Sequence, residues 1–352
     1  MDKYLPRLLC KTVLLLLILG LCAGCTKTST FTIIFASNAE GNYEIYKITS
    51  NGQNIERLTN TSADEQDIVP SPDGRKVIFD YGGVRLEKDI FLLNVESGVI
   101  SQLTSALAYD IPGTWSPHGD QLSFISDRDG GYYWLYVMKA DGSDQRRIPL
   151  ETDPERSVYR PKWSPSGEYI LYAATQHIHA PQPLIPALFV VDLLTLNVRR
   201  LTSEQMGSCD EGTWSPDGNW IMVACENGVY IVHPDGTELK RLAMGAQIHC
   251  YNPEWSPDGE WVALRCRNDI DPRMDIYIVK PDGSELRRVT AGMPNNLIIR
   301  ELKWAPDSRR IVYITRTETD KTHHINVVEI DGREYQEIYT VGAALCCLSI
   351  VR

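Results

Sequence analysis

The chain has 352 residues, of which 43% are hydrophobic and 23% charged, so it can bury a sizeable core. Its formal net charge of −11 disfavours contact with phosphate backbones, which excludes nucleic acid as an expected partner.

The N-terminus carries a processing signal. Three basic residues accompany the apolar run Thr12–Leu21, which is too short to cross a bilayer comfortably and is typical of a cleaved signal peptide. The following Ala23-Gly24-Cys25 resembles the lipobox of bacterial lipoproteins, although Cys22 stands where that motif usually has a branched aliphatic residue. We expect residues 1–24 to be removed and Cys25 to carry a lipid that anchors an exported protein to a membrane. The alternative is an ordinary signal peptide with a nearby cleavage site.

A short lipidated linker, residues 25–30, then leads into a repeat that fills the rest of the chain. Its motif is of the type Trp-Ser-Pro-Asp-Gly, and the steps from one copy to the next are 41 to 51 residues. The proline at the third position of the motif is here called the motif proline. In the six copies it is Pro72, Pro117, Pro165, Pro216, Pro257 and Pro306. Proline presets φ, Asp can bond its own backbone and Gly accepts a positive φ, so the motif predicts a tight turn.

Each repeat also predicts four short strands. An alternating strand such as Glu260–Leu264 follows the turn, and a second such as Asp275–Val279 comes after a loop of variable length. An Asp-Gly turn leads to a third strand, and the next Trp-Ser-Pro segment supplies a fourth. This order of turns and strands indicates an all-β propeller of four-stranded antiparallel blades over residues 31–352.

The two ends of the chain decide the number of blades. Thr32–Phe35 is a strand without a preceding turn motif, and Ala344–Val351 is a lone apolar strand. We expect the C-terminal strand to complete the blade that the N-terminus begins, which closes a ring of seven blades and removes exposed sheet edges. Six blades is the alternative.

The six motif copies resemble the repeats of TolB-type, WD-repeat-like propellers, which also occur in relatives of prolyl oligopeptidase. The resemblance covers residues 31–352 and implies the architecture. TolB proteins have an additional N-terminal α/β domain and six blades, and the peptidases have a C-terminal hydrolase domain, so we do not carry a TolB role over. A Gly-x-Ser-x-Gly nucleophile motif is absent from the sequence.

Alternating strand direction sorts the loops onto two faces. The motif turns and the Asp-Gly turns share one face, here called the hairpin face, and the loops of variable length share the other, the variable-loop face, where binding sites on rigid scaffolds normally lie. If the Trp-bearing strands are innermost, as the resemblance implies, the residues that lead into them surround the mouth of the central channel. The candidate binding residues are Asp67, Asp110, Tyr159, Arg160, Asp210, Glu211, His249, Tyr251, Arg300 and Glu301. The alternative is a solvated rim without a ligand.

The cysteines favour disulfides. Cys209 and Cys225 are 16 residues apart, as are Cys250 and Cys266, and each pair stands nearly symmetrically about a motif turn. Each pair can therefore form a bond within its own blade in an oxidising compartment, although pairing between blades has equal spacing. Cys346 and Cys347 fall at about the same position as Cys209 and Cys250, so a thiol cluster that binds metal is a further alternative.

We expect neither a metal nor another cofactor. His177 and His179 supply only two ligands, and Asp127–Gly130 and Asn268–Asp271 do not match the spacing of a calcium loop. The favoured function is a non-catalytic envelope lipoprotein, a monomeric ring that binds a protein or glycan partner on its variable-loop face. The alternative is a polysaccharide lyase or hydrolase that acts at the channel mouth.

Overall fold

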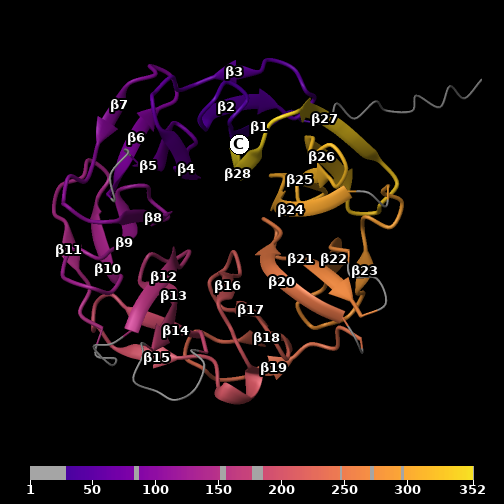
Figure 1. Ribbon diagram of the computed structural model, residues 1–352. Coiled ribbons are helices and arrows are strands. Elements are labelled where there is room, and N and C mark those ends of the chain that lie inside the picture. The colour runs from indigo at the N-terminus through magenta and orange to yellow at the C-terminus, as the bar shows by residue number, and fades with distance from the viewer. Residues whose placement is uncertain are drawn as a thin grey trace, which may run out of the picture.

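In the computed structural model, seven antiparallel sheets of four strands each surround a central channel (Figure 1). The structure describes residues 29–82, 87–150, 156–176, 185–245, 248–269, 273–294 and 297–351. The predicted all-β, seven-bladed propeller is confirmed, and the six-bladed alternative is wrong. The signal peptide, Cys25, His177 and His179 lie outside the described residues. No helix in the described ranges is long and apolar enough to span a membrane.

We number the blades I to VII along the chain and give their strands from the channel outward. Blade I contains β28 (Leu345–Val351), β1 (Thr32–Ser37), β2 (Glu44–Thr49) and β3 (Glu56–Arg57). Blade II contains β4 (Asp64–Pro70), β5 (Lys76–Gly82), β6 (Lys88–Asn94) and β7 (Ile100–Gln102). Blade III contains β8 (Asp110–Trp115), β9 (Gln121–Ser126), β10 (Trp134–Lys139) and β11 (Arg146–Arg147). Blade IV contains β12 (Arg156–Trp163), β13 (Tyr169–Gln176), β14 (Ala187–Asp192) and β15 (Val198–Arg200).

The remaining blades repeat this order. Blade V contains β16 (Glu211–Trp214), β17 (Ile221–Cys225), β18 (Gly228–Val232) and β19 (Lys240–Arg241). Blade VI contains β20 (Ile248–Trp255), β21 (Val262–Asn268), β22 (Asp275–Val279) and β23 (Arg287–Arg288). Blade VII contains β24 (Leu297–Trp304), β25 (Arg310–Thr317), β26 (His323–Glu329) and β27 (Tyr335–Val341). A short 3₁₀ helix, η1 (Glu204–Met206), precedes blade V.

The ring closes within blade I, as the sequence predicts. The C-terminal strand β28 pairs antiparallel with β1, and Thr32 lies opposite Val351. In Figure 1 the yellow β28 lies beside the indigo β1. Blade I therefore takes its innermost strand from one end of the chain and its other three strands from the opposite end.

The motif turns follow the predicted chemistry. In blade VI, Ser256 Oγ donates to the carboxylate of Asp258 at 2.6 Å and accepts from the N–H of Trp261 at 2.9 Å. Gly259 takes a positive φ of 74°. The sixth copy, in blade VII, has Ser308 at the glycine position, with φ 58°, and its hydroxyl accepts from the N–H of Asp258 in the neighbouring motif at 3.0 Å.

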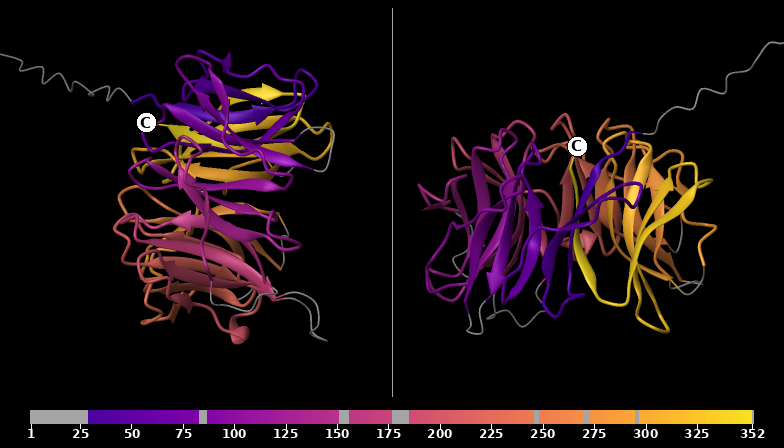
Figure 2. Two further views of the ribbon diagram at one scale, coloured as in Figure 1. Left: turned by 90° about the vertical axis from the view of Figure 1, so that its left-hand side faces the viewer. Right: turned by 90° about the horizontal axis from the view of Figure 1, so that it is seen from above.

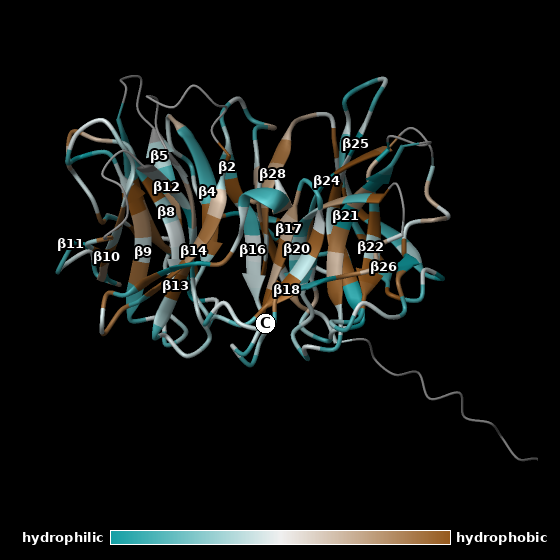
Figure 3. Ribbon diagram, turned by 90° about the horizontal axis from the view of Figure 1, so that it is seen from below, coloured by the Kyte–Doolittle hydropathy of each residue, from teal (hydrophilic) through white to brown (hydrophobic). Residues whose placement is uncertain are grey.

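The hydrophobic core lies between blades rather than within them. Seven apolar clusters occur in the described residues, and each joins two adjacent blades. In one, Leu171 and Leu188 of blade IV pack with Trp214 and Val223 of blade V. Hydrophobic segments accordingly gather in the strands and hydrophilic ones at the loops of both faces (Figure 3). Because every blade is covered on both sides, β17 is buried at every position.

Motif tryptophans bond four of the blades to the blade before them. The indole N–H of Trp304 donates to the backbone carbonyl of Glu254, on the innermost strand of blade VI, at 2.8 Å. Trp115, Trp214 and Trp255 make the equivalent bond at 3.0 to 3.3 Å. Trp163 departs from this pattern, because its indole nitrogen is buried without a partner in the described residues.

This departure supplies a matched control for the interblade bond. Trp304→Phe and Trp163→Phe remove similar apolar area, but only the first also removes a hydrogen bond and leaves the carbonyl of Glu254 without its donor. We expect Trp304→Phe to lower the free energy of unfolding by about 1 to 2 kcal/mol more than Trp163→Phe does. Urea denaturation of both variants measures the difference, and equal losses would contradict a stabilising role for this bond.

Candidate functional site: the channel mouth

The channel opens into a cavity of about 560 Å³ that every blade lines. Each innermost strand contributes the residue five positions before its motif proline, or its equivalent in β28, and we call this set the rim ring. The rim ring consists of Asp67, Pro112, Arg160, Glu211, Asn252, Glu301 and Cys347. The residues two positions further along form the inner ring, of which Val69, Thr114, Lys162, Glu254, Lys303 and Ser349 line the cavity.

A β-bulge directs the rim residues into the channel. The register of β4, β12 and β20 against the next strand shifts at this position, and a bulge turns a side chain away from the regular alternation. Asp67, Arg160 and Asn252 take positive φ values of 46°, 53° and 52° there. Non-glycine residues rarely adopt this conformation, because it is sterically strained. The same conformational strain therefore occurs at the equivalent position of several blades.

Two rim carboxylates hold the next blade in place. Glu301 accepts from the backbone N–H groups of Cys347 and Leu348 at 3.0 and 2.7 Å. Glu211 accepts from the backbone N–H of Asn252 at 2.6 Å and from its side-chain amide. These acids therefore satisfy amides that the bulges leave free, and their first role is structural.

Two channel cations have acidic partners. Arg160 contacts Glu211 directly and lies 3.7 Å from the carboxylate of Asp210. Lys303 bonds to Glu254 at 2.9 Å, and the negative charge of Glu254 raises the pKa of Lys303. Both are thus compensated within the cavity.

Three further cations lack an acidic partner among the described residues. Lys162 donates to the backbone carbonyl of Gly212 at 2.9 Å. Arg265 donates to the side-chain oxygen of Asn252 and to the carbonyl of Arg300, and the Arg300 side chain lines the same cavity. Burial lowers the pKa of Lys162, with Lys303 and Arg160 acting in the same direction, and burial lowers that of Arg265. An anion in the cavity would compensate this charge.

Asp67 is an acidic residue that lines the same cavity. It belongs to blade II, makes no hydrogen bond in the described structure, and is accessible from the channel although protein surrounds it. Burial, followed by the nearby carboxylate of Asp80, raises its pKa to about 6. The cavity is therefore asymmetric: of the five cations and five acids that line it, blade IV contributes two cations, blade V two acids and blade II one acid.

The structure brings six of the ten predicted residues to the cavity. These are Asp67, Arg160, Asp210, Glu211, Arg300 and Glu301.

The other four predicted residues do not line it. Asp110 is completely buried and pairs with Arg128 at 2.7 Å. Tyr159 is packed against two interblade clusters, and burial raises its pKa to about 12. Tyr251 lies opposite Arg265 in the sheet, and the exposed His249 pairs with Asp269 at 3.0 Å. All four precede the rim position, but so do Asp210 and Arg300, which line the cavity, so the distance from the motif alone does not decide which side chains reach the channel.

Sequence reasoning missed Lys162, Glu254 and Lys303, which the repeat itself could have found. All three stand three residues before a motif proline. Arg265 comes from the second strand of blade VI, and the repeat offers no signal for it. The turn predicted at Asp127–Gly130 is present, and there Arg128 binds Asp110 rather than contributing to a metal site.

The cysteines form the in-blade pairs. Cys209 is joined to Cys225 and Cys250 to Cys266, and in the second pair the residues are direct neighbours across β20 and β21. Cys346 and Cys347 are free thiols with sulfurs 2.9 Å apart, and Cys347 belongs to the rim ring.

Comparison with known proteins identifies the family. The model of the TolB beta propeller domain matches residues 71–182 and 182–344. The chain belongs to this family. Over 106 residues this chain is 35% identical to the uncharacterized peptidase YuxL of Bacillus subtilis, and the matched segment covers 29% of this chain and 16% of that protein. A segment of 139 residues is 28% identical to the Tol-Pal system protein TolB of Francisella tularensis, covering 39% and 32%. The matches thus span less than half of these relatives.

Solved structures agree on the fold. An oligogalacturonate lyase of Vibrio parahaemolyticus superposes with a TM-score of 0.66 at 16% identity, over 88% of this chain and 85% of that one. At this identity the similarity establishes the propeller architecture alone.

The structural role of the rim carboxylates is testable at the ring closure. In Glu301→Gln, one acceptor oxygen and one NH₂ group face two backbone N–H donors of β28. We expect a loss of about 1 to 3 kcal/mol in the free energy of unfolding and faster amide exchange in β28. Glu56→Gln, at an exposed ion pair on β3, is the control and should change neither. Unchanged exchange in β28 would contradict the assignment.

Proposed function

We propose that this chain is an exported, lipid-anchored, non-catalytic scaffold whose channel mouth binds a carboxylate-bearing segment of an envelope protein. The observation that supports this most directly is the group of Lys162, Arg265 and Arg300, which converge on one cavity without acidic partners among the described residues. Lysine and arginine groups in a confined, partly desolvated site favour an anion, and arginine matches the planar geometry of a carboxylate. A volume of about 560 Å³ suits a short peptide segment.

The position of the first described residues supports an orientation for the anchored ring. Ser29 lies at the hairpin face, where its carbonyl accepts from Arg310 at 2.7 Å, and β1 begins there beside the end of β28. In Figure 2 the indigo start of the described chain lies at one face of the ring, close to its C-terminal end. With a lipid on Cys25, the hairpin face would lie toward the membrane. The variable-loop face and the channel mouth would then point away from it, toward a partner.

A lyase or hydrolase that acts on an acidic polysaccharide is the second candidate. The fold similarity to an oligogalacturonate lyase favours it, because the same cations would suit the carboxylates of uronic acids. The residues lining the described cavity include neither His nor Tyr, so the general base would be Asp67, whose pKa is raised, or Lys162, whose pKa is lowered. We place this candidate second because its support is a likeness of fold at 16% identity.

The charge requirement can be tested with a labelled hexaglutamate peptide on the mature propeller. We expect Lys162→Gln combined with Arg265→Gln to weaken binding at least about 10-fold, because each lost charge removes roughly 1 kcal/mol or more in a confined site. Fluorescence anisotropy at two salt concentrations measures the affinity, which should fall as salt rises.

Arg333→Gln also removes a positive charge, but at an exposed site on the hairpin side, and should leave the affinity unchanged. Binding lost equally in this control, or no binding by the parent protein, would contradict the proposal. Oligogalacturonate incubated in parallel distinguishes the second candidate, because formation of an unsaturated product would establish a lyase.

A further inference from the structure

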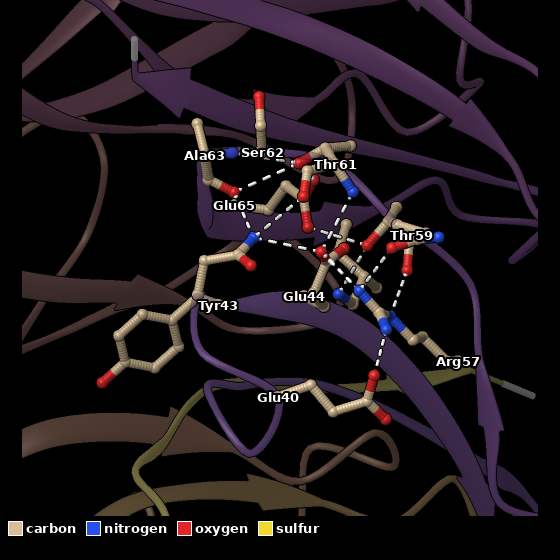
Figure 4. Close-up of polar contacts among 12 residues, drawn as sticks. Glu40, Tyr43, Glu44, Arg57, Thr59, Thr61, Ser62, Ala63 and Glu65 are labelled. Atoms are coloured by element: carbon tan, nitrogen blue, oxygen red, sulfur yellow. Dashed lines mark hydrogen bonds and ion pairs between the residues drawn. The ribbon is translucent and has the colours of Figure 1, made fainter. Parts of the chain in front are cut away.

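Two acidic side chains are buried at the junction of blades I and II. Glu44 begins β2 and Glu65 lies in β4, and both residues have no solvent exposure. Figure 4 shows their carboxyl groups within one polar cluster, together with Arg57 and the segment Thr59–Ala63 that connects the two blades. This cluster is separate from the cavity of the channel.

Glu44 receives most of the available donors. Its Oε1 accepts from Asn42 at 3.0 Å, from Arg57 at 2.7 Å and from the backbone N–H of Thr61 at 3.0 Å. Its Oε2 is buried and has no hydrogen-bond partner in the described structure. A buried carboxylate oxygen without a donor carries a substantial cost, so the cluster lacks one proton donor.

Glu65 receives only hydroxyl donors. Thr59 donates to its Oε2 at 2.7 Å and Thr61 to its Oε1 at 2.5 Å. Neither donor carries a charge, and a fully buried ionised carboxylate without a cation is strongly disfavoured.

The surrounding charges do not supply a second cation. Arg57, on β3, is shared between Glu44 and the exposed Glu40. The other titratable groups facing the cluster are Asp64 on β4, Tyr43 before β2, Tyr46 on β2 and Tyr81, which lies opposite Glu65 on β5. Of the two buried acids, Glu44 therefore has a guanidinium partner and Glu65 has none, among neighbours that are acidic or neutral.

We propose that Glu44 and Glu65 hold one proton between them, and that this proton fastens the connector between the first and second blades. With the proton on Glu65, its O–H is the donor that Oε2 of Glu44 lacks. Thr59 and Thr61, the two residues that bond to Glu65, are part of the connector, so the proton stabilises the path of the chain from blade I into β4. Loss of the proton leaves two negative charges in a dry pocket and loosens this connector.

The titration of the pair follows from the same contacts. Burial, together with the charge of Glu44, raises the pKa of Glu65 to about 7 against its ordinary value of 4.5. Burial alone would also raise the pKa of Glu44, but the hydrogen bonds that its carboxylate accepts, including those from Arg57 and Asn42, bring it below the ordinary value. The folded state therefore binds a proton that the unfolded state releases. This contribution to stability is full below about pH 4.5 and is lost as pH rises through about 7.

A second acidic pair in the next junction provides an internal comparison. Asp110 occupies the position of Glu65 in blade III, and Asp89 the position of Glu44 in blade II. Here Arg128 pairs with Asp110 at 2.7 Å, and Asp89 is half-exposed. The buried acid of this junction thus has its own cation, and the arrangement does not require a shared proton.

The decisive variant is Glu65→Gln, whose amide reproduces the protonated acid and can donate to Glu44. We expect the unfolding equilibrium constant of the parent protein, relative to that of Glu65→Gln, to rise by about 100-fold between pH 5 and pH 8. Urea denaturation across this range measures both proteins. Asp110→Asn, which removes the partner of Arg128, should instead destabilise the protein at every pH.

Two results would overturn the proposal. One is a parent-to-variant ratio that stays constant with pH, and the other is a Glu65→Gln protein destabilised at all pH values, as expected for Asp110→Asn. If Glu65→Gln does not fold, carbon-13 NMR of glutamate carboxyl groups in the parent protein gives the answer directly. A buried glutamate that titrates near pH 7 supports the shared proton, and its absence contradicts it.

Discussion

The propeller depends on burial between blades, because a blade has little core of its own. Residues such as Val223 and Leu264 are completely buried only because a neighbouring blade covers them. A blade in isolation would expose both faces of its central strands, at a cost of about 25 cal/mol for each Å² of apolar surface. The ring must therefore close, and β28 closes it by joining the first three strands of the chain. The tryptophan bonds and the rim carboxylates act on the same junctions.

The channel mouth is a consequence of this arrangement. The seven innermost strands run side by side around the axis, so one residue offset of the repeat becomes a ring of side chains (Figure 1). The bulge at that offset frees backbone amides, which Glu211 and Glu301 then bind. Neither acid forms a direct ion pair with Lys162 or Arg265 in the described residues, but the charge of Glu211 still favours the cationic form of both. The cavity lining thus carries as many cations as acids, although the whole chain is acidic.

The sequence predicted the architecture well because turn chemistry and repeat length are local signals. The motif Ser-Pro-Asp-Gly determines its own turn, and unmatched strands at the two ends imply closure. The site was predicted less well, because a bulge changes which side chains face the channel and leaves no mark in the motif. Tyr159 and Arg160 are adjacent in sequence, yet the first packs into the core and the second lines the cavity. Arg265 reaches the channel from a second strand, which only the three-dimensional arrangement reveals.

The residue seven positions before the motif proline must be buried against the preceding blade, and different blades use different side chains for this. The residues at this position, with the equivalent residue of β28, are Glu65, Asp110, Val158, Cys209, Cys250, Ile299 and Leu345. All seven are buried where an innermost strand meets the preceding blade. Three blades use an apolar side chain there, two use a disulfide and one uses an ion pair.

Only blade II buries a carboxyl group at this position without a cation of its own. An apolar residue would satisfy the demand for burial at lower cost, since a buried acid gains little unless it is fully paired. The acid instead makes the strength of one junction depend on proton concentration near neutrality. That junction holds β4, whose bulge two residues later places Asp67 in the channel mouth. A loosened connector therefore acts first on the rim residue of blade II, whereas blades V and VI are each held by a disulfide.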